Sequence, residues 1–448
     1  MKRKTGILIL TALLCAAALL LSACVTVHTD IPTDSGETAA PTPSDTASVP
    51  SETQESETAA PAPSDTVSVP SETQESETAA PAETEPQTPA EPTAEERVRQ
   101  IMANMTLREK IAQMCFVMPE ALLGTDTAVT AAGEDVKATF DKTPVGGVIL
   151  MGQNLQSMSQ TKALCAALQS FSESRLGLPV FIGVDEEGGD VARVSGTGKF
   201  GIGAVPRMAT VGASGDPAQA RGWGQTVGEY LKDLGFNLDF APDADVLSNP
   251  DNTVVKTRSF GADGNLVALM AHAFAEGLQE EGVRACYKHF PGHGATAEDS
   301  HKGFAVSYRT KDELWENDLI PFADAVSGNI PFIMSGHISL PNASGKDLPA
   351  SLNYEILTGL LRSEMHYNGI IITDALDMGA ITQRFSAAEV AVLAVQAGND
   401  MLLIANDLDS YVTALEKAVR DGEIGEDRID ESVFRILREK LVNQETVR

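Results

Sequence analysis

Eight short apolar runs, separated by longer amphipathic stretches, constrain the fold of this 448-residue chain more than any other feature. The runs are 114–118, 146–151, 179–185, 237–242, 285–289, 331–337, 369–374 and 400–405. The stretches with helical spacing are 157–175, 216–234, 264–281, 312–326, 354–365 and 387–396, followed by a last one at 427–442. Nearly continuous apolar strands that alternate with helices are typical of a parallel sheet buried on both faces. The sequence therefore predicts an α/β fold, a single (β/α)₈ TIM-type barrel over residues 94–448, with an open doubly wound sheet as the alternative.

The N-terminus has the composition of a targeting signal. Basic residues at 2–4 precede an apolar run over 6–21, which is too short for a stable membrane span. The ending LSAC at 21–24 resembles the lipobox of bacterial lipoproteins. This resemblance implies a signal peptide over 1–23 and a lipid on Cys24, which would anchor the protein to the extracytoplasmic face of the cell membrane. An ordinary signal peptide with a chance cysteine is the alternative.

Residues 24–93 are rich in Ser, Thr, Pro and Glu and contain a 20-residue repeat that starts at Thr38 and again at Thr58. Residues 25–96 hold sixteen acidic side chains and no Lys or Arg. Such a segment buries too little apolar surface to offset its ordering entropy, so we expect a disordered tether, with a binding module as the alternative. The formal net charge of −30 argues against binding of nucleic acid, because such binding needs a basic face.

Polar side chains close several of the predicted strands. They are Asp185, Asp243, Asp245, Lys288, His289, His337 and Asp374. A single Asp in such a place is usually a helix cap. Several strands that end alike favour an active site, because the carboxyl ends of barrel strands meet at one face.

Other kinds of site have less support. His289 and His293, followed by Asp299 and His301, have the residue types of a metal site, but Phe-Pro-Gly breaks the helix that would align the two histidines. The chain has no GxGxxG, GxxxxGK[ST] or GxSxG motif of dinucleotide, P-loop or serine hydrolase sites. We therefore expect neither a metal nor an organic cofactor.

Several motifs together resemble glycoside hydrolase family 3, and within it the bacterial β-N-acetylglucosaminidases. The motifs are KHFPGHG at 288–294, DSH at 299–301, VDEEGG at 184–189, RSFG at 258–261 and IITDALDM at 371–378. The resemblance extends over residues 94–448. β-Glucosidases of the same family lack the DSH loop and take their acid from a second domain, so here the acid is expected within the barrel.

The resemblance also implies roles for single residues. Asp374 matches the nucleophile, His301 matches the acid/base, and Asp299 would orient His301. The residues expected to bind the sugar are Asp185, Arg193, Arg258, Lys288 and His289. Three positions, Asp190, Asp243 and Lys256, depart from the family pattern and leave the leaving-group side unassigned.

These observations predict a monomeric retaining exo-β-N-acetylglucosaminidase that acts on peptidoglycan-derived or related glycans. A β-N-acetylglucosaminide phosphorylase is an alternative, because a neutral histidine does not repel phosphate. A β-glucosidase or β-xylosidase of the same family is another. A lipoprotein that binds wall glycan without turnover is the alternative outside the enzyme class.

Overall fold

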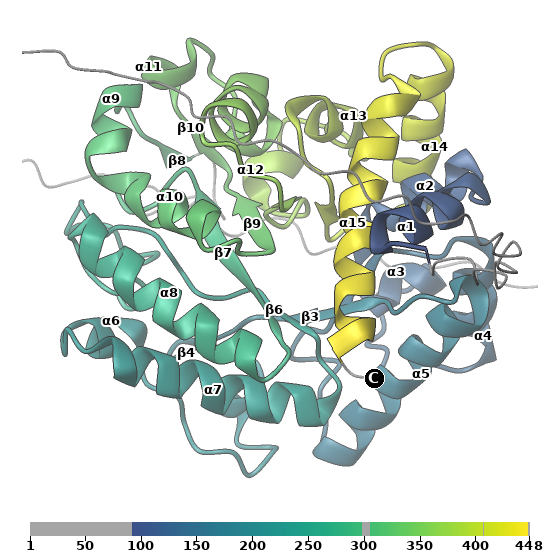
Figure 1. Ribbon diagram of the computed structural model, residues 1–448, viewed down its shortest axis with the longest axis horizontal. Helices are drawn as coiled ribbons and strands as arrows, with labels where there is room; N and C mark the ends of the chain where they lie inside the picture. The colour runs from purple at the N-terminus through teal and green to yellow at the C-terminus, as the bar shows by residue number, and fades with distance from the viewer. Residues whose placement is uncertain (1–91, 298–304, 406, 447–448) are drawn as a thin grey trace, which may run out of the picture. The chain divides into compact units, whose positions relative to one another are not determined.

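The computed structural model describes residues 92–297, 305–405 and 407–446, and a parallel barrel lies within this part (Figure 1). The barrel strands are β1 (Cys115–Val117), β2 (Gly147–Ile149), β3 (Phe181–Val184), β6 (Leu238–Asp239), β7 (Arg284–Phe290), β9 (Phe332–Ser335), β11 (Ile370–Thr373) and β12 (Leu402–Leu403). These eight strands follow the order β11-β9-β7-β6-β3-β2-β1-β12, and neighbouring strands are parallel. A parallel bridge between Ile372 and Met401 joins β11 to β12 and closes the sheet. The predicted (β/α)₈ barrel is confirmed, and the open doubly wound sheet is wrong.

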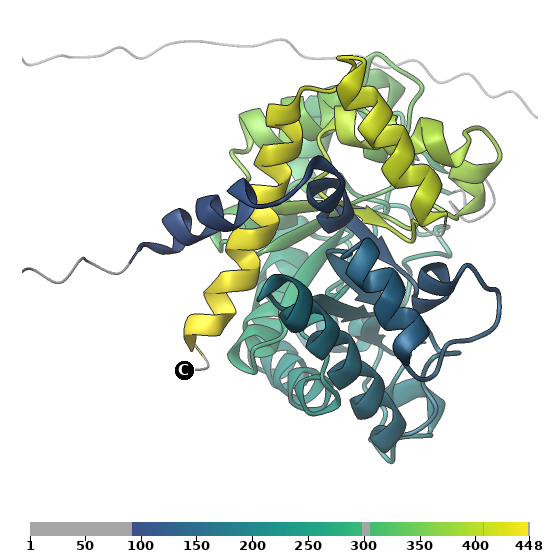
Figure 2. The same ribbon diagram turned by 90° about the vertical axis from the view of Figure 1, so that its right-hand side faces the viewer.

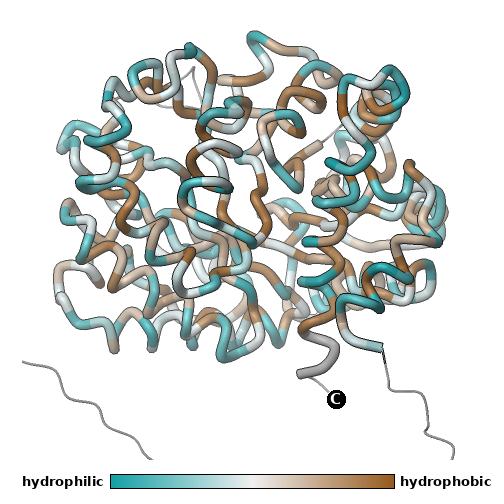
Figure 3. The backbone as a smooth tube through the Cα atoms, turned by 45° about the horizontal axis from the view of Figure 1, so that its top comes forward, coloured by the Kyte–Doolittle hydropathy of each residue, from teal (hydrophilic) through white to brown (hydrophobic). Residues whose placement is uncertain are grey.

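Each of the eight apolar runs coincides with one barrel strand, of which β7 extends one residue beyond its run at each end, and all residues of these strands are buried. The interior is tightly packed: Phe116 lies opposite Gly147 in the register of β1 and β2. A Cβ atom at Gly147 would lie 2.3 Å from the Phe116 ring, so only glycine fits there. Figure 3 shows hydrophobic residues along the inner segments and hydrophilic residues mainly on the outer turns.

Helices cover the outside of the barrel (Figures 1 and 2). They include α2 (Leu107–Gln113), α3 (Pro119–Leu123), α4 (Glu134–Lys142), α5 (Met158–Leu176), α7 (Pro217–Leu234), α8 (Gly264–Glu280), α13 (Ala387–Ala397) and α14 (Leu408–Arg420). Ser157, Asp216 and Asp263 cap α5, α7 and α8, because their side chains accept backbone N–H groups of the first turn. Near the two ends of the described chain, α1 (Ala94–Ala103) packs beside α15 (Glu426–Thr446) (Figure 2). Within the described residues, every helix is too short or too polar to cross a bilayer.

Two of the predicted helices differ from a regular α-helix. The stretch 312–326 is divided into α9 (Lys311–Glu313), the π-helix η2 (Leu314–Asp318) and α10 (Ile320–Ser327). The Leu319 N–H donates to the Leu314 carbonyl at 2.9 Å, and Pro321, which has no N–H, lies in the first turn of the next helix. The stretch 354–365 forms the π-helix η4 (Glu355–Glu364).

Smaller elements follow several barrel strands. They are the antiparallel hairpin β4 (Glu186–Gly188) and β5 (Val191–Ala192), η1 (Ser195–Thr197), α6 (Met208–Gly212), β8 (Ala305–Val306), β10 (Ile338–Ser339), α11 (Pro341–Ser344), η3 (Ala350–Leu352) and α12 (Gly379–Thr382). The hairpin turns at Gly188 and Gly189, whose φ angles of 90° and 57° favour glycine. It starts two residues after β3 ends, so it lies beyond the carboxyl end of that strand. These insertions supply walls for a site at this face of the barrel.

Candidate active site

A pocket of about 470 Å³ lies at the carboxyl ends of the barrel strands. It is lined by Asp185, Arg193, Arg258, Lys288, His289 and Asp374, together with Glu187 and apolar residues such as Met118, Met151 and Met378. The structure thus brings together the five residues expected to bind the sugar and the expected nucleophile. Asp299, His301 and Cys24 lie outside the described residues.

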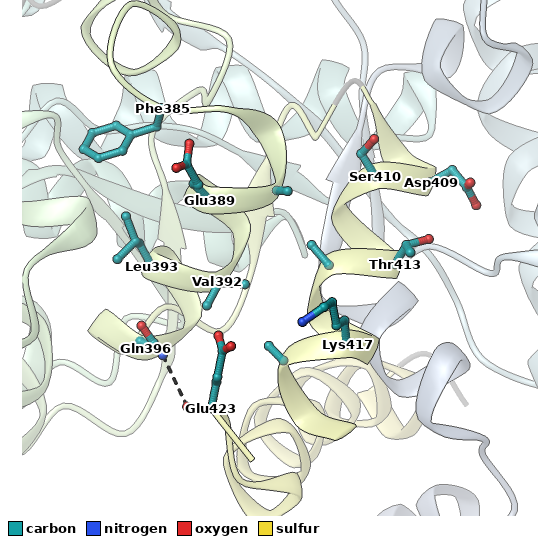
Figure 4. Close-up of a pocket in the computed structure, with 13 residues that line it drawn as sticks. Phe385, Glu389, Val392, Leu393, Gln396, Asp409, Ser410, Thr413, Lys417 and Glu423 are labelled. Atoms are coloured by element: carbon teal, nitrogen blue, oxygen red, sulfur yellow. Dashed lines mark hydrogen bonds between the residues drawn. The ribbon is translucent and has the colours of Figure 1, made fainter. Parts of the chain in front are cut away.

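A larger hollow of about 800 Å³ lies elsewhere, between α13 and α14 (Figure 4). In Figure 4, Val392 and Leu393 of α13 lie across the hollow from Thr413 and Lys417 of α14. Its walls come from helices on the outside of the barrel, and no strand end reaches it. The smaller pocket is therefore the candidate active site, because it lies at the strand ends and contains the predicted site residues.

Glu187 connects the two main cations of the pocket. Its carboxylate accepts both Nε and Nη2 of Arg258 at 2.7 Å and lies 2.6 Å from Nζ of Lys288, which also contacts Asp185 at 2.9 Å. Burial alone raises the pKa of Glu187, but the Arg258 guanidinium and the Lys288 ammonium overcome it and lower the pKa to about 2. An ionised Glu187 therefore holds both cations in fixed positions.

Glu187 was not among the predicted site residues. The signal that could have found it is its spacing from Asp185. Residues two apart on an extended segment point to the same side, and both carboxylates contact Lys288.

His289 is oriented by Asp245. The Oδ2 atom of Asp245 lies 2.7 Å from Nδ1 of His289, and its Oδ1 accepts the backbone N–H groups of His289 and His293 at 3.2 and 2.6 Å. Burial lowers the pKa of His289, but the Asp245 carboxylate outweighs burial and raises it. Because Nδ1 is engaged, Nε2 is the nitrogen that His289 can offer to a ligand.

Asp374 follows β11 directly, and its backbone N–H donates to the Ser335 carbonyl at 2.9 Å. Its Oδ1 accepts the Ala375 N–H at 2.8 Å, whereas Oδ2 has no hydrogen bond within the described residues. Burial raises the pKa of Asp374, but the nearby His337 and His289 outweigh burial and lower it. An ionised carboxylate with one unengaged oxygen is suited to nucleophilic attack.

Arg193 reaches the pocket from the loop after β5, and a fully buried carboxylate fixes this loop. Glu186 accepts the N–H groups of Val194 and Ser195 at 2.7 and 2.8 Å and the Tyr230 hydroxyl at 2.8 Å. The Nε atom of Arg193 is buried without a hydrogen-bond partner among the described residues. Arg193 therefore has N–H capacity left for a ligand.

Asp243, Asp245 and His289 bring possible ligand atoms within 4.8 Å of one another. However, the Arg258 guanidinium lies 3.3 Å from Oδ2 of Asp243 and 3.5 Å from Nε2 of His289. A positive charge thus already lies beside these atoms and opposes a metal ion. His293, the other histidine of the metal hypothesis, pairs its Nδ1 with Oγ1 of Thr296 at 2.8 Å. The donor set fits a hydrogen-bonding pocket better than a metal centre.

The chain matches the family described as glycosyl hydrolase family 3 N terminal domain over residues 106–439. It is 32% identical over 370 residues to the β-hexosaminidase LpqI of Mycobacterium tuberculosis, which covers 80% of this chain and 87% of that protein. It is 34% identical over 341 residues to β-hexosaminidase A of Pseudoalteromonas piscicida, which covers 70% of this chain but 56% of that protein.

Solved structures agree with these relatives. The structure of a glycoside hydrolase family 3 β-N-acetylglucosaminidase from Paenibacillus sp. str. FPU-7 aligns with a TM-score of 0.70 and 35% identity, over 75% of this chain and 62% of that one. The chain therefore spans little more than half of some relatives and most of others.

Proposed function

The chain belongs to glycosyl hydrolase family 3, and we propose that it is a retaining exo-β-N-acetylglucosaminidase that releases terminal, non-reducing N-acetylglucosamine from peptidoglycan-derived or related glycans. The observation that carries this proposal is Asp374, whose ionised carboxylate keeps one oxygen unengaged in a pocket with Lys288, Arg258 and Arg193. Relatives named β-hexosaminidase and β-N-acetylglucosaminidase support the sugar class. The barrel-strand residues next to the pocket are buried in a packed interior, and we infer that the substrate enters by one end.

The proposed chemistry has two steps. First, Oδ2 of Asp374 bonds to the anomeric carbon while the glycosidic C–O bond breaks, and His301 gives its proton to the leaving oxygen. Second, His301 takes a proton from water, the water oxygen bonds to the anomeric carbon, and the bond to Asp374 breaks. Asp299 would orient the His301 ring, as the aspartate of a catalytic triad does.

The charges of the pocket favour a neutral sugar. Lys288 is paired with Asp185 and Glu187, and Arg258 is paired with Glu187 and Asp243, so neither cation is left to attract an anion. Charge-assisted hydrogen bonds from these groups would orient hydroxyl groups and the acetamido group. Arg193, from the loop after β5, would add further donors.

A panel of aryl β-glycosides tests the sugar class. We expect the N-acetylglucosaminide to give a higher kcat/KM than the glucoside and the xyloside, and the first product to keep the β configuration by NMR. A higher kcat/KM with either of the other two sugars would contradict the proposal. The same assay in phosphate buffer would identify a phosphorylase by release of sugar 1-phosphate.

A further inference from the structure

We propose that a second, smaller hollow holds the leaving-group sugar of the substrate, a neutral pyranose such as a second N-acetylglucosamine unit. The hollow measures about 290 Å³, and its walls include Ser248, Asn249, Ala295, Tyr308 and Arg309. We call it the Tyr308 hollow. The inference rests on the proposed function, because it assigns the other half of the same substrate.

One turn of the chain contributes to both the Tyr308 hollow and the active-site pocket. His293 lines the pocket, whereas Ala295, two residues later, lines the hollow. The turn between them is fixed: Asn249 donates its N–H to the Gly294 carbonyl at 3.0 Å and its Nδ2 to the Thr296 carbonyl at 3.2 Å. A Cβ atom at Gly294 would lie 1.8 Å from the Val246 carbonyl oxygen. The turn at 293–295 is therefore closely packed against the segment that contains Val246.

Tyr308 supplies an aromatic face. Its side chain is 70% exposed, although its backbone is held in place by a 2.6 Å bond from Nδ2 of Asn342 to its carbonyl. The preceding residue, Ser307, donates its N–H to the Ser339 carbonyl at 2.9 Å. Single exposed apolar residues are common and need no explanation. A ring that lines a polar hollow from a hydrogen-bonded segment of backbone differs from these, because it offers a flat apolar surface to the C–H face of a sugar ring.

Polar groups of the hollow have unused hydrogen-bonding capacity. The Ser248 hydroxyl is buried and has no hydrogen-bond partner in the described part of the chain. Arg309 bonds through Nη1 to the buried carboxylate of Asp318 at 2.6 Å, which fixes the guanidinium and neutralises its charge. Nη1 also donates to the Glu313 carbonyl at 3.4 Å, whereas Nε and Nη2 have no hydrogen bond within the described residues and remain for a ligand. A fixed, neutralised guanidinium beside a free hydroxyl suits sugar hydroxyl or acetamido groups better than an anion.

The position along the chain agrees with this role. Tyr308 follows His301, the proposed acid, by seven residues. An acid in the proposed role acts on the glycosidic oxygen that joins the two sugars, and seven residues of chain are long enough for Tyr308 to reach the leaving-group sugar.

Two substrates with different leaving groups test the inference in the full-length protein. The leaving group of N,N′,N″-triacetylchitotriose is a disaccharide, whereas the leaving group of β-N-acetylglucosaminyl fluoride is a single fluoride ion. We expect Tyr308→Ala to lower kcat/KM for chitotriose by about tenfold, which corresponds to about 1.4 kcal/mol, and to leave the fluoride within about twofold. Tyr308→Trp should retain activity on chitotriose. The matched control is Tyr354→Ala, because Tyr354 is 53% exposed and lines neither the hollow nor the pocket.

Other results would overturn the assignment. If Tyr308→Ala lowered kcat/KM equally for both substrates, Tyr308 would be needed for the fold or for placing the acid. If kcat/KM for chitotriose were unchanged, the ring would touch no sugar. Failure of the wild type to hydrolyse the fluoride would count against the proposed function alone. In that case, calorimetric titration with chitotriose still tests the assignment of the hollow. A Kd about tenfold higher for Tyr308→Ala than for the wild type would support the assignment, and an equal Kd would contradict it.

Discussion

At the scale of single residues, the site shifts the pKa values of neighbouring buried carboxyl groups in opposite directions. Burial and the charge of Glu186 raise the pKa of Asp239, and burial and the charge of Asp245 raise the pKa of Asp243. By contrast, nearby cations hold Glu187 and Asp374 ionised despite burial. The neighbouring basic groups therefore offset the cost of burying Glu187 and Asp374, so the nucleophile can stay ionised in a pocket lined by other acids.

A first prediction concerns Glu186. Glu186→Gln replaces one acceptor by an amide N–H₂ that must face either the Val194 or the Ser195 N–H, so the loop that carries Arg193 should shift. A hydrogen bond to a buried charged group is worth about 1.5–3 kcal/mol, so we expect KM for an aryl N-acetylglucosaminide to rise by about tenfold or more while kcat changes less. Glu229→Gln, at an exposed position of α7, is the matched control. Equal kinetics of the two variants would show that Glu186 does not position Arg193.

A second prediction separates the two proposed catalytic residues. Asp374→Ala should abolish turnover of every substrate, because no glycosyl-enzyme can form. His301→Ala should lose about 10²–10⁴-fold on a disaccharide, whose leaving oxygen needs a proton, and far less in the glycosylation of an activated aryl substrate. Added azide should partly restore His301→Ala and give a β-configured glycosyl azide. Equal losses on both substrates without azide rescue would exclude His301 as the acid/base.

At the scale of elements, periodicity could predict the barrel but not all of its details. Each apolar run became a strand because a parallel barrel buries both faces of every strand. The spacing of apolar residues does not predict the π-helices η2 and η4, because a π-helix depends on where the helix accommodates an extra residue as it packs on the barrel. In the site, strand ends pointed to Asp185 and Lys288. The role of Glu186 depends on the β4–β5 hairpin folding back toward Tyr230, which no local pattern specifies.

A third prediction concerns α15 and its fully buried Lys440. The ammonium lies 2.8 Å from Oε1 of Gln113 and 5.2 Å from the centre of the Phe181 ring, and burial, together with Arg284, lowers its pKa to about 7. Between pH 7 and the ordinary lysine pKa of about 10.4, the unfolded chain binds more protons than the folded one, so this group makes stability rise with pH. The contribution of Lys440 to the free energy of unfolding is least favourable below pH 7, where its side chain is protonated in both the folded and the unfolded chain.

Lys440→Met should remove this dependence. The free energy of unfolding of the variant relative to wild type should therefore fall as pH rises from 6 to 9.5, at a limiting slope of about 1.4 kcal/mol per pH unit. Urea titrations at several pH values measure this difference, in which other titrating groups cancel. Lys417→Met, at a position whose side chain is 65% exposed, should give a flat difference. A flat difference for Lys440→Met as well would mean that water reaches its ammonium.

At the scale of the whole molecule, we propose that the barrel is held at a membrane by a lipid on Cys24. Cys24→Ala should move the protein from the membrane fraction to the soluble or secreted fraction, because acyl chains contribute about 0.8 kcal/mol per buried CH₂ and the substitution removes their attachment point. Fractionation followed by immunoblotting measures the shift, and Cys165→Ala, a buried free cysteine of the barrel, is the control. Retention of Cys24→Ala in the membrane would indicate an uncleaved signal segment.

The acidic repeat segment gives the last prediction. All residues that line the pocket and the Tyr308 hollow lie between Met118 and Ile404, so removal of residues 30–89 takes nothing from either site. A tether that only provides reach spans a root-mean-square distance of about 5–6 Å times the square root of its length, and its loss should matter only when the substrate is far from the anchor. We therefore expect the deletion to leave kcat/KM for a soluble aryl substrate unchanged, and to lower release of N-acetylglucosamine from insoluble wall glycan when the enzyme is anchored on vesicles.

The same deletion combined with Cys24→Ala should restore release from the insoluble glycan, because an enzyme without an anchor needs no reach. A drop of more than about threefold on the soluble substrate would instead show that the segment packs on the barrel and contributes to its stability.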